Sequence, residues 1–306
     1  MSGNSPSSSQ LEIAHRIREQ GAVLDVEAAY ALYRDALQAQ PRDGVAVTRG
    51  LEYGAHERQQ LDLYRAEQSV RRPLPVVVFF HGGGFLRGDK SQRENFGYYF
   101  ARHGYLVAVA NYRLAPSHPW PSGAEDVIAV WQWVRARIAE FGGSADAVFL
   151  AGESAGAANV ALATLAKRFQ PPDFKIAGAV LISGVYNVQL EHLAREQLRI
   201  PSPDPRNEAY FGSDFSRYRE MSTIDLVDAA PFPLWMSYAE LDLVQMQVQA
   251  GQLFASLVCK HHFAPHLYVV PGHNHLTQVH AVNTGDESLT RPIHEFLESH
   301  GVQENL

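Results

Sequence analysis

Apolar runs recur along the chain with the length and composition of buried strands. The continuous β-branched and aromatic run over Leu74–Phe80 is typical of a strand that is covered on both faces of a parallel sheet. Residues Val45–Tyr53 and Gln60–Ala66 alternate between apolar and polar positions, which predicts an antiparallel hairpin. Further strands are expected over Tyr105–Ala110, Ala147–Ala151, Ile176–Ser183, Phe232–Tyr238 and His266–Val270.

Segments with apolar residues at helical spacing separate these runs. Helices are predicted over Arg93–His103, Ser122–Phe141, Ala157–Lys167, Gln245–Lys260 and Leu289–Ser299. Because strand and helix patterns alternate, we expect an α/β fold with a doubly wound, mostly parallel sheet.

Two segments fall outside this alternation. Residues 11–42 contain helical patterns ahead of the first strand, and they either pad the core or cover the active site as a cap. Residues 186–230 are rich in proline and aromatic residues and are too long for a plain connection, which favours a second cap segment. We therefore expect a disordered tail over residues 1–10, then the first helices, and one catalytic domain over residues 43–306.

Composition narrows the class of protein. The net charge of -7 argues against nucleic acid or an anionic membrane surface as the main partner. No apolar run is long enough to predict a membrane span. The single cysteine, Cys259, suits a reducing compartment, and the first ten residues lack the basic and apolar parts of a signal peptide, so we expect a cytoplasmic protein.

The segment around Ser154 has the pattern of a nucleophile elbow. An apolar run ends in Gly152-Glu153-Ser154-Ala155-Gly156, and an alanine-rich helical pattern follows. Glycine two positions before and after the serine allows a tight turn that holds the hydroxyl clear of the sheet, at the positive end of the following helix. We predict that Ser154 is the nucleophile of an acyl-transfer reaction.

A serine nucleophile needs a base and an acid, which in this fold follow it along the chain and lie after strands. Asp242 is our candidate acid, since its position lets the loop curl back under the histidine, and Glu240 is the alternative. His275 is our candidate base, and His273 is the alternative. No cysteine or carboxylate cluster accompanies these histidines at ligand spacing, so we expect no metal.

A glycine-rich turn directly follows the Leu74–Phe80 strand. It reads His81-Gly82-Gly83-Gly84, and bare backbone amides in such a turn can approach a substrate closely. Gly83, Gly84 and Ala155 are the predicted oxyanion-hole donors. His81 is expected to support the turn, and Phe85 and Tyr186 are candidates for the substrate pocket. A nucleotide site is not expected, because the glycines lack the spacing of the phosphate-binding motifs.

Taken in order, three motifs resemble the hormone-sensitive-lipase-like branch of the α/β-hydrolase carboxylesterases. They are the glycine turn, the segment Tyr112–Pro121 and the serine elbow. The resemblance covers roughly residues 74–299 and implies an α/β-hydrolase fold with a mostly parallel eight-stranded sheet and cap segments. It implies Ser154, Asp242 and His275 as the triad, Gly83, Gly84 and Ala155 as the oxyanion hole, and residues 112–116 as a brace for the glycine turn.

The chain departs from that family pattern at several positions. Glu153 replaces the usual aspartate, Ala157 replaces a glycine, Leu243 follows the acid in place of proline, and Leu276 follows the histidine in place of glycine. These features resemble the neighbouring small esterases and kynurenine-formamidase-like hydrolases.

The expected activity is hydrolysis of small-molecule carboxylic esters, with short to medium acyl or small aromatic groups, through an acyl-enzyme and without a cofactor. Arylformamide or amide hydrolysis with the same triad is the alternative, and a catalytically silent hydrolase-fold binding module is a further one. A homodimer is left open.

Overall fold

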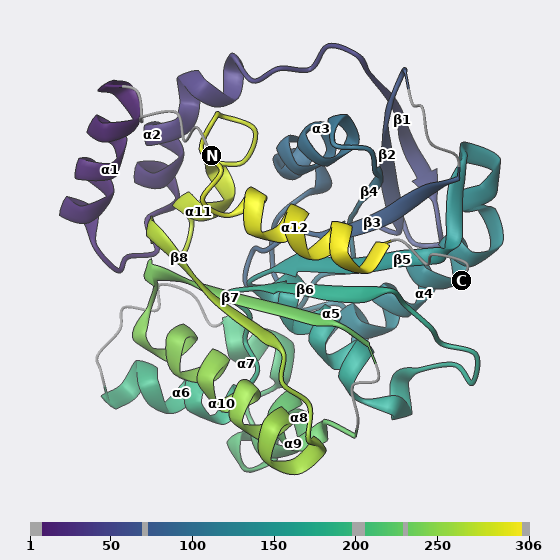
Figure 1. Ribbon diagram of the computed structural model, residues 1–306. Helices are drawn as coiled ribbons and strands as arrows, with labels where there is room; N and C mark the ends of the chain where they lie inside the picture. The colour runs from purple at the N-terminus through teal and green to yellow at the C-terminus, as the bar shows by residue number, and fades with distance from the viewer. Residues whose placement is uncertain (1–7, 69–72, 198–205, 229–231, 302–306) are drawn as a thin grey trace.

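An eight-stranded sheet forms the centre of the computed structural model, which describes residues 8–68, 73–197, 206–228 and 232–301 (Figure 1). The strand order is β1-β2-β4-β3-β5-β6-β7-β8, with β1 and β2 antiparallel and the strands from β3 to β8 parallel. This confirms the predicted mostly parallel eight-stranded sheet. The strands are β1 Val45–Glu52, β2 Gln60–Ala66, β3 Leu74–Phe80, β4 Leu106–Ala110, β5 Gly143–Glu153, β6 Gly178–Ile182, β7 Leu234–Leu241 and β8 His266–Asn274.

Helices pack on both faces of the sheet, as a doubly wound fold requires (Figure 1). The helices that cover the faces are α3 Glu94–Arg102, α4 Ser122–Arg137, α5 Ala155–Leu165, α10 Val244–His261 and α12 Thr290–Gly301, with short helix α11 Thr277–His280 after β8. Short 3-10 turns occur at η1 Lys90–Arg93, η2 Ile138–Phe141 and η3 Lys167–Phe169. The predicted helix over residues 122–141 is thus split into α4 and η2.

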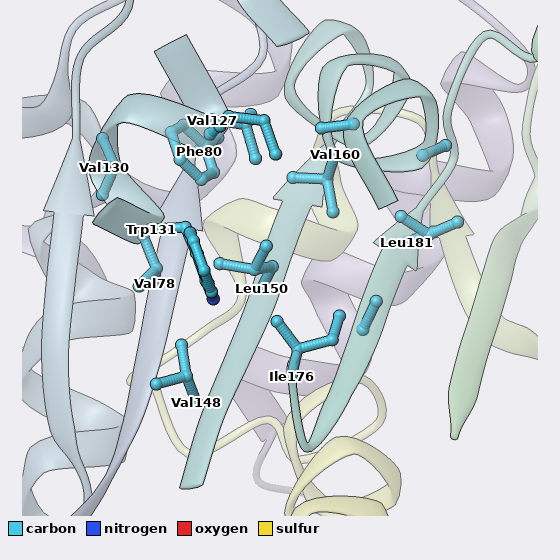
Figure 2. Close-up of a cluster of buried hydrophobic side chains, with 14 of the residues drawn as sticks. Val78, Phe80, Val127, Val130, Trp131, Val148, Leu150, Val160, Ile176 and Leu181 are labelled. Atoms are coloured by element: carbon cyan, nitrogen blue, oxygen red, sulfur yellow. The ribbon is translucent and has the colours of Figure 1, made fainter. Parts of the chain in front are cut away.

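Successive residues of the central strands face opposite layers of the core. In β3, Val76 and Val78 pack with α4 and α5, whereas Val77 and Phe79 pack with α3 and α12. Figure 2 shows the first of these layers, where Val148 and Leu150 of β5 lie beside side chains from α4 and α5. Both faces are apolar because both are covered, and this explains why the strands have continuous rather than alternating hydrophobicity.

The segments ahead of β1 form α1 Ser8–Gln20 and α2 Val26–Gln38, and the long segment after β6 forms α6 Val188–Gln197, α7 Arg206–Phe211, η4 Phe215–Arg217, α8 Tyr218–Met221 and α9 Thr223–Leu226. Helix α1 begins at Ser8, so the last three residues of the predicted disordered tail are helical. The rest of the predicted tail, residues 1–7, lies outside the described part of the chain. Residues 198–205 and 229–231, which fall within or next to the predicted insertion over residues 186–230, also lie outside it.

Two glycines on helices provide a matched test of packing at the nucleophile turn. A Cβ atom at Gly156 would lie 2.2 Å from the carbonyl oxygen of Phe80, whereas a Cβ at Gly251 of α10 would meet nothing within 4 Å. We expect Gly156→Ala to lower the free energy of unfolding by about 2–3 kcal/mol through overpacking. The control Gly251→Ala should raise it by about 0.5–1 kcal/mol through helix propensity. Urea unfolding measures both, and equal effects of the two changes would contradict this description of the turn.

Candidate active site

Ser154 occupies a strained turn between β5 and α5. Its φ is 49° and its ψ is -117°, a conformation that residues with a side chain rarely adopt. The turn is held by the Ser154 amide, which donates to the Ile182 carbonyl at 2.8 Å. A Cβ at Gly152 would lie 2.6 Å from the backbone of Gly156, so the turn has no space for side chains at these positions. The glycine-serine-glycine pattern therefore forms the sharp turn that the sequence predicted.

The structure brings the three predicted triad residues together. The Ser154 hydroxyl donates to Nε2 of His275 at 3.0 Å, and Nδ1 of His275 donates to Oδ1 of Asp242 at 2.8 Å. Each residue directly follows the end of a parallel strand, β5, β7 or β8. Since these strands all point toward the same edge of the sheet, residues far apart in the sequence meet there.

The carboxylate of Asp242 is buried and accepts hydrogen bonds at both oxygens. Besides His275, its donors are the backbone amides of Ala239 at 3.2 Å and Leu243 at 2.9 Å, and the hydroxyl of Ser183 at 2.6 Å. These donors replace water around a side chain that is 1% exposed. The acid is therefore fixed in position and in rotamer.

Ser183 and Gln278 connect the acid to the histidine loop. Gln278 Nε2 donates both to the Ser183 hydroxyl at 2.7 Å and to the His275 carbonyl at 3.1 Å. Ser183 directly follows β6, the strand between β5 and β7, and has a positive φ of 49°. The sequence analysis missed both residues. A polar residue after the strand next to the nucleophile strand was the available signal for Ser183, whereas nothing local distinguished Gln278.

The electrostatic environment of His275 raises the affinity of its imidazole for a proton. Burial alone would lower the pKa of this imidazole, but the charge and hydrogen bond of Asp242 outweigh burial and raise the pKa above its usual value. The same hydrogen bond fixes the neutral tautomer that carries its proton on Nδ1, so that Nε2 faces Ser154 as an acceptor. This arrangement suits a general base.

The two alternative residues have other partners. Glu240 is exposed and accepts a hydrogen bond from the amide of Gly272 at 2.7 Å. His273 contacts Thr277, Ser288 and Asp286 through its two ring nitrogens. These contacts direct both side chains to neighbours other than Ser154, so the geometry favours Asp242 and His275 over them.

The glycine turn after β3 lies directly on the serine turn. Gly83 and Gly84 have φ values of 127° and 61°, which favour glycine. Among the described residues, neither amide donates a hydrogen bond to a neighbouring backbone carbonyl. Ala155 is the first residue of α5, where amides lack an acceptor within the helix. The glycine turn thus adjoins Ser154 through Gly82, where a Cβ would lie 3.2 Å from Cβ of Ser154. The oxyanion role of Gly83, Gly84 and Ala155 stays a prediction.

Neighbouring residues brace the glycine turn. Nδ1 of the His81 imidazole donates to the Gly82 carbonyl at 2.6 Å, and burial lowers the pKa of His81 to about 4, so the ring is neutral. Tyr112 stacks on this imidazole at 4.6 Å and donates its hydroxyl proton to the His81 carbonyl at 3.0 Å. The Ala115 amide donates to the Phe85 carbonyl at 3.0 Å. These contacts agree with the supporting role predicted for His81 and for residues 112–116.

The two pocket candidates lie in different environments. Phe85 stacks on Tyr210 of α7 with 4.2 Å between ring centroids, in an apolar cluster that includes Ala155 beside the nucleophile. Tyr186 is 1% exposed and belongs to the main core, and its hydroxyl accepts from the Gly184 amide. The structure therefore brings Phe85, and not Tyr186, into the cluster that adjoins Ser154.

Both cap candidates contact this part of the molecule. Residues of α7 and α8 share the cluster of Phe85, and Leu24, between α1 and α2, packs against it. Helices α1 and α2 also contact the chain around His275, because α2 packs on α11 and Asn274 donates a hydrogen bond to the Gly21 carbonyl at 3.4 Å. Figure 1 shows α1 and α2 beside the end of β8 and α11.

Within the described residues, no group of three or more His, Cys, Asp or Glu side chains is arranged to hold a metal ion. Over the same part of the chain, none of the helices combines the length and the apolar character that crossing a bilayer requires.

Comparison with known proteins supports the same fold. A family model described as alpha/beta hydrolase fold matches residues 77–256, which is more than half of the chain. Carboxylesterase NlhH of Mycobacterium tuberculosis is 41% identical over 88 residues, which cover 28% of each protein. The probable carboxylic ester hydrolase LipM of the same species is 31% identical over 218 residues, which cover 66% of this chain and 49% of LipM. The chain thus spans less than half the length of these curated relatives.

Solved structures share the fold over nearly the whole chain. Esterase B from Lactobacillus rhamnosis has a TM-score of 0.74 at 18% identity and covers 96% of both chains. A structure titled bacterial heroin esterase has a TM-score of 0.72 at 23% identity and covers 94% of this chain and 95% of its own. Together with the matched family model and the motifs of the glycine and serine turns, these likenesses identify the chain as a member of the α/β-hydrolase fold family, in its hormone-sensitive-lipase-like branch.

Proposed function

We propose that this protein is a serine carboxylesterase that hydrolyses small carboxylic esters. The observation that carries the proposal is the hydrogen-bonded chain from Ser154 through His275 to Asp242, with the glycine turn in contact with Ser154 at Gly82. Such a chain activates a hydroxyl that is otherwise a poor nucleophile. The local similarity to carboxylesterase NlhH and to LipM supports an ester as the substrate.

In the proposed mechanism, the Ser154 oxygen attacks the ester carbonyl carbon while Nε2 of His275 takes the hydroxyl proton. Negative charge develops on the former carbonyl oxygen, where the amides of Gly83, Gly84 and Ala155 stabilise it. His275 returns the proton to the departing alcohol, and an acyl-enzyme remains. The same imidazole then takes a proton from water as the water attacks the acyl carbonyl. The bond to the Ser154 oxygen breaks, the imidazolium returns the proton to that oxygen, and the carboxylic acid leaves. Asp242 holds the imidazole in the required tautomer throughout.

The apolar surroundings of the site suggest how substrates are selected. Phe85 and Tyr210 form a closed aromatic stack beside the nucleophile helix. We propose that this cluster contacts the acyl or alcohol group and favours short acyl chains or small aromatic esters. The segments α1–α2 and α6–α9 would form the cap above it. A cytoplasmic location stays a prediction from the sequence, and a homodimer stays open.

Arylformamide hydrolysis is the second candidate, because the same triad cleaves amides and the chain shares features with formamidase-like hydrolases around Glu153 and His275. The leaving group distinguishes the two reactions: an ester loses an alkoxide or phenolate, whereas a formamide loses its amine only after its nitrogen has been protonated, because an amide anion is too basic to leave.

The first test uses chromogenic esters of increasing acyl length, with aryl formamides in parallel. We expect Ser154→Ala to reduce ester hydrolysis by roughly 10⁴-fold or more while the protein stays folded. Ser144→Ala, at the opposite end of β5, is the matched control and should keep wild-type activity. Hydrolysis of formamides alone by the wild type would favour the second candidate, and full activity of Ser154→Ala would refute the mechanism.

A second prediction concerns pH. Because His275 must be neutral to accept the serine proton, kcat/KM should fall as the pH drops through its pKa, which Asp242 holds above the usual value of about 6.5. Asp242→Asn removes the negative charge that raises the pKa of His275, so the fall of kcat/KM on the acid side of the profile (the acid limb) should move to lower pH. We also expect kcat to fall by roughly 10³–10⁴-fold. A pH–rate profile measures both effects. An acid limb at the same pH in Asp242→Asn and in the wild type would contradict the pairing of Asp242 with His275.

A third prediction concerns the support of the acid. Ser183→Ala removes the 2.6 Å donor to Asp242 Oδ2 and the acceptor for Gln278, but leaves the amide donors in place. We expect kcat to fall about tenfold, since the carboxylate loses one of several hydrogen bonds. Steady-state kinetics with the best ester measures the loss, and unchanged kcat would show that the amides alone hold the acid.

A further inference from the structure

Glu153, directly before the nucleophile, occupies a position that the mechanism above does not use. It is the last residue of β5 and is only 4% exposed. A carboxylate is rarely so fully buried without specific partners, because its desolvation is costly. The family pattern has an aspartate here, so this chain places a side chain that is longer by one methylene beside its nucleophile.

Both partners of Glu153 donate to the same carboxylate oxygen. Oε1 accepts a hydrogen bond from the Gly82 amide at 3.0 Å and another from Nε of Arg93. Arg93 is 9% exposed and also donates to the Gln92 carbonyl at 2.7 Å. Burial alone would raise the pKa of Glu153, but Arg93 and the Gly82 amide outweigh burial and lower it, so the carboxylate is ionised.

Gly82 is the residue through which this carboxylate reaches the oxyanion donors. It immediately precedes Gly83 and Gly84, and a Cβ placed on it would lie 3.2 Å from Cβ of Ser154. The glycine turn is thus in contact with the serine turn at this point. The carbonyl of Gly82 accepts from His81, so the residue is held at both its amide and its carbonyl.

We propose that Glu153 is a positioning residue that fixes the glycine turn beside Ser154 by holding the amide of Gly82, with Arg93 holding its carboxylate in place. The turn has two glycines in succession with positive φ, so it has wide conformational freedom when unrestrained. An oxyanion hole stabilises charge only when its donors are already placed at the start of the reaction. A buried charged acceptor anchored by an arginine provides that restraint.

The same charge acts on the base. Three carboxylates raise the pKa of the His275 imidazole: Asp242, which bonds it directly, and then Glu153 of β5 and Glu191 of α6. Arg93, His81, Tyr112 and His280 are further titratable groups near Glu153. Burial with the nearby Arg93 lowers the pKa of His280 to about 3, so His280 is neutral. Loss of the Glu153 charge therefore removes a smaller share of the stabilisation of the imidazolium than loss of Asp242.

Two variants separate the reach of the side chain from its charge. Glu153→Asp keeps the charge but shortens the side chain by about 1.5 Å, which withdraws the acceptor from Gly82. The double variant Arg93→Met with Glu153→Gln keeps an oxygen at the same reach and removes both charges, so that no buried charge is left unpaired. Glu240→Gln is the matched control, because Glu240 also accepts from a glycine amide, at 2.7 Å, but is exposed.

The readout is the rate at which an aryl fluorophosphonate labels Ser154, measured against pH, together with kcat and KM for the best ester. Labelling needs the nucleophile, the base and the oxyanion hole, but no turnover of an ester, so this test stands even if the proposed esterase function, on which the inference rests, fails. We expect Glu153→Asp to slow labelling and lower kcat by roughly 10–100-fold, with KM changed by less than about threefold and the acid limb in place.

The double variant should label within about fivefold of the wild-type rate, because its side chain still reaches Gly82. Glu240→Gln should match the wild type in both labelling rate and kcat. Wild-type labelling and kcat in Glu153→Asp, with a loss of thermal stability alone, would overturn the positioning role. A wild type that is never labelled at Ser154 would overturn both this proposal and the mechanism.

Discussion

The contact between helix α5 and the end of β3 is the constraint on which the rest of the site depends. Gly156 lies so close to the backbone of Phe80 and His81 that a Cβ atom would come within 2.2 Å and 2.6 Å of their carbonyl oxygens. This contact places the first turn of α5 beside the glycine turn. The first turn of α5 and the glycine turn can therefore lie in contact only because residue 156 has no side chain.

From this contact the site extends along the edge of the sheet. The order β3-β5-β6-β7-β8 places the ends of these strands in a row, and the row carries the glycine turn, Ser154, Ser183, Asp242 and His275 in sequence. The backbone of each strand is held by its neighbours, so the site inherits the rigidity of the sheet. Two buried carboxylates, Glu153 and Asp242, then link neighbouring ends through hydrogen bonds. Each carboxylate accepts more than one hydrogen bond, and these offset the free-energy cost of removing its charge from water.

The sequence predicted the elements that depend on local pattern. Each described strand matches a predicted one, because continuous apolar runs such as residues 74–80 are typical of strands buried on both faces of a sheet. Strand ends were less predictable. Both β7 and β8 continue past the apolar runs, to Leu241 and Asn274, since their last residues pair with each other across the sheet and need no apolar side chains. The same extension brings Asp242 and His275 directly to the strand ends.

What the sequence did not reveal depends on contacts between distant segments. The roles of Ser183 and Gln278 arise only when β6, β7 and α11 are assembled, and Arg93 is separated from Glu153 by 60 positions. Tyr186 follows a strand in the way expected of a pocket residue, but its side chain turns into the core. The irregular helices α6–α9 also lack a clear periodic pattern, because short helices packed on neighbours need only a few apolar residues.

The most direct test of the proposed mechanism is to identify the covalent intermediate. Wild-type protein would be acid-quenched during turnover of a slowly deacylated ester, digested, and mapped by mass spectrometry. The mechanism predicts one acyl group on the peptide that contains Ser154, absent when the ester is omitted. Rapid turnover with no acyl adduct under any quench condition, or an adduct on another residue, would contradict a mechanism that passes through Ser154.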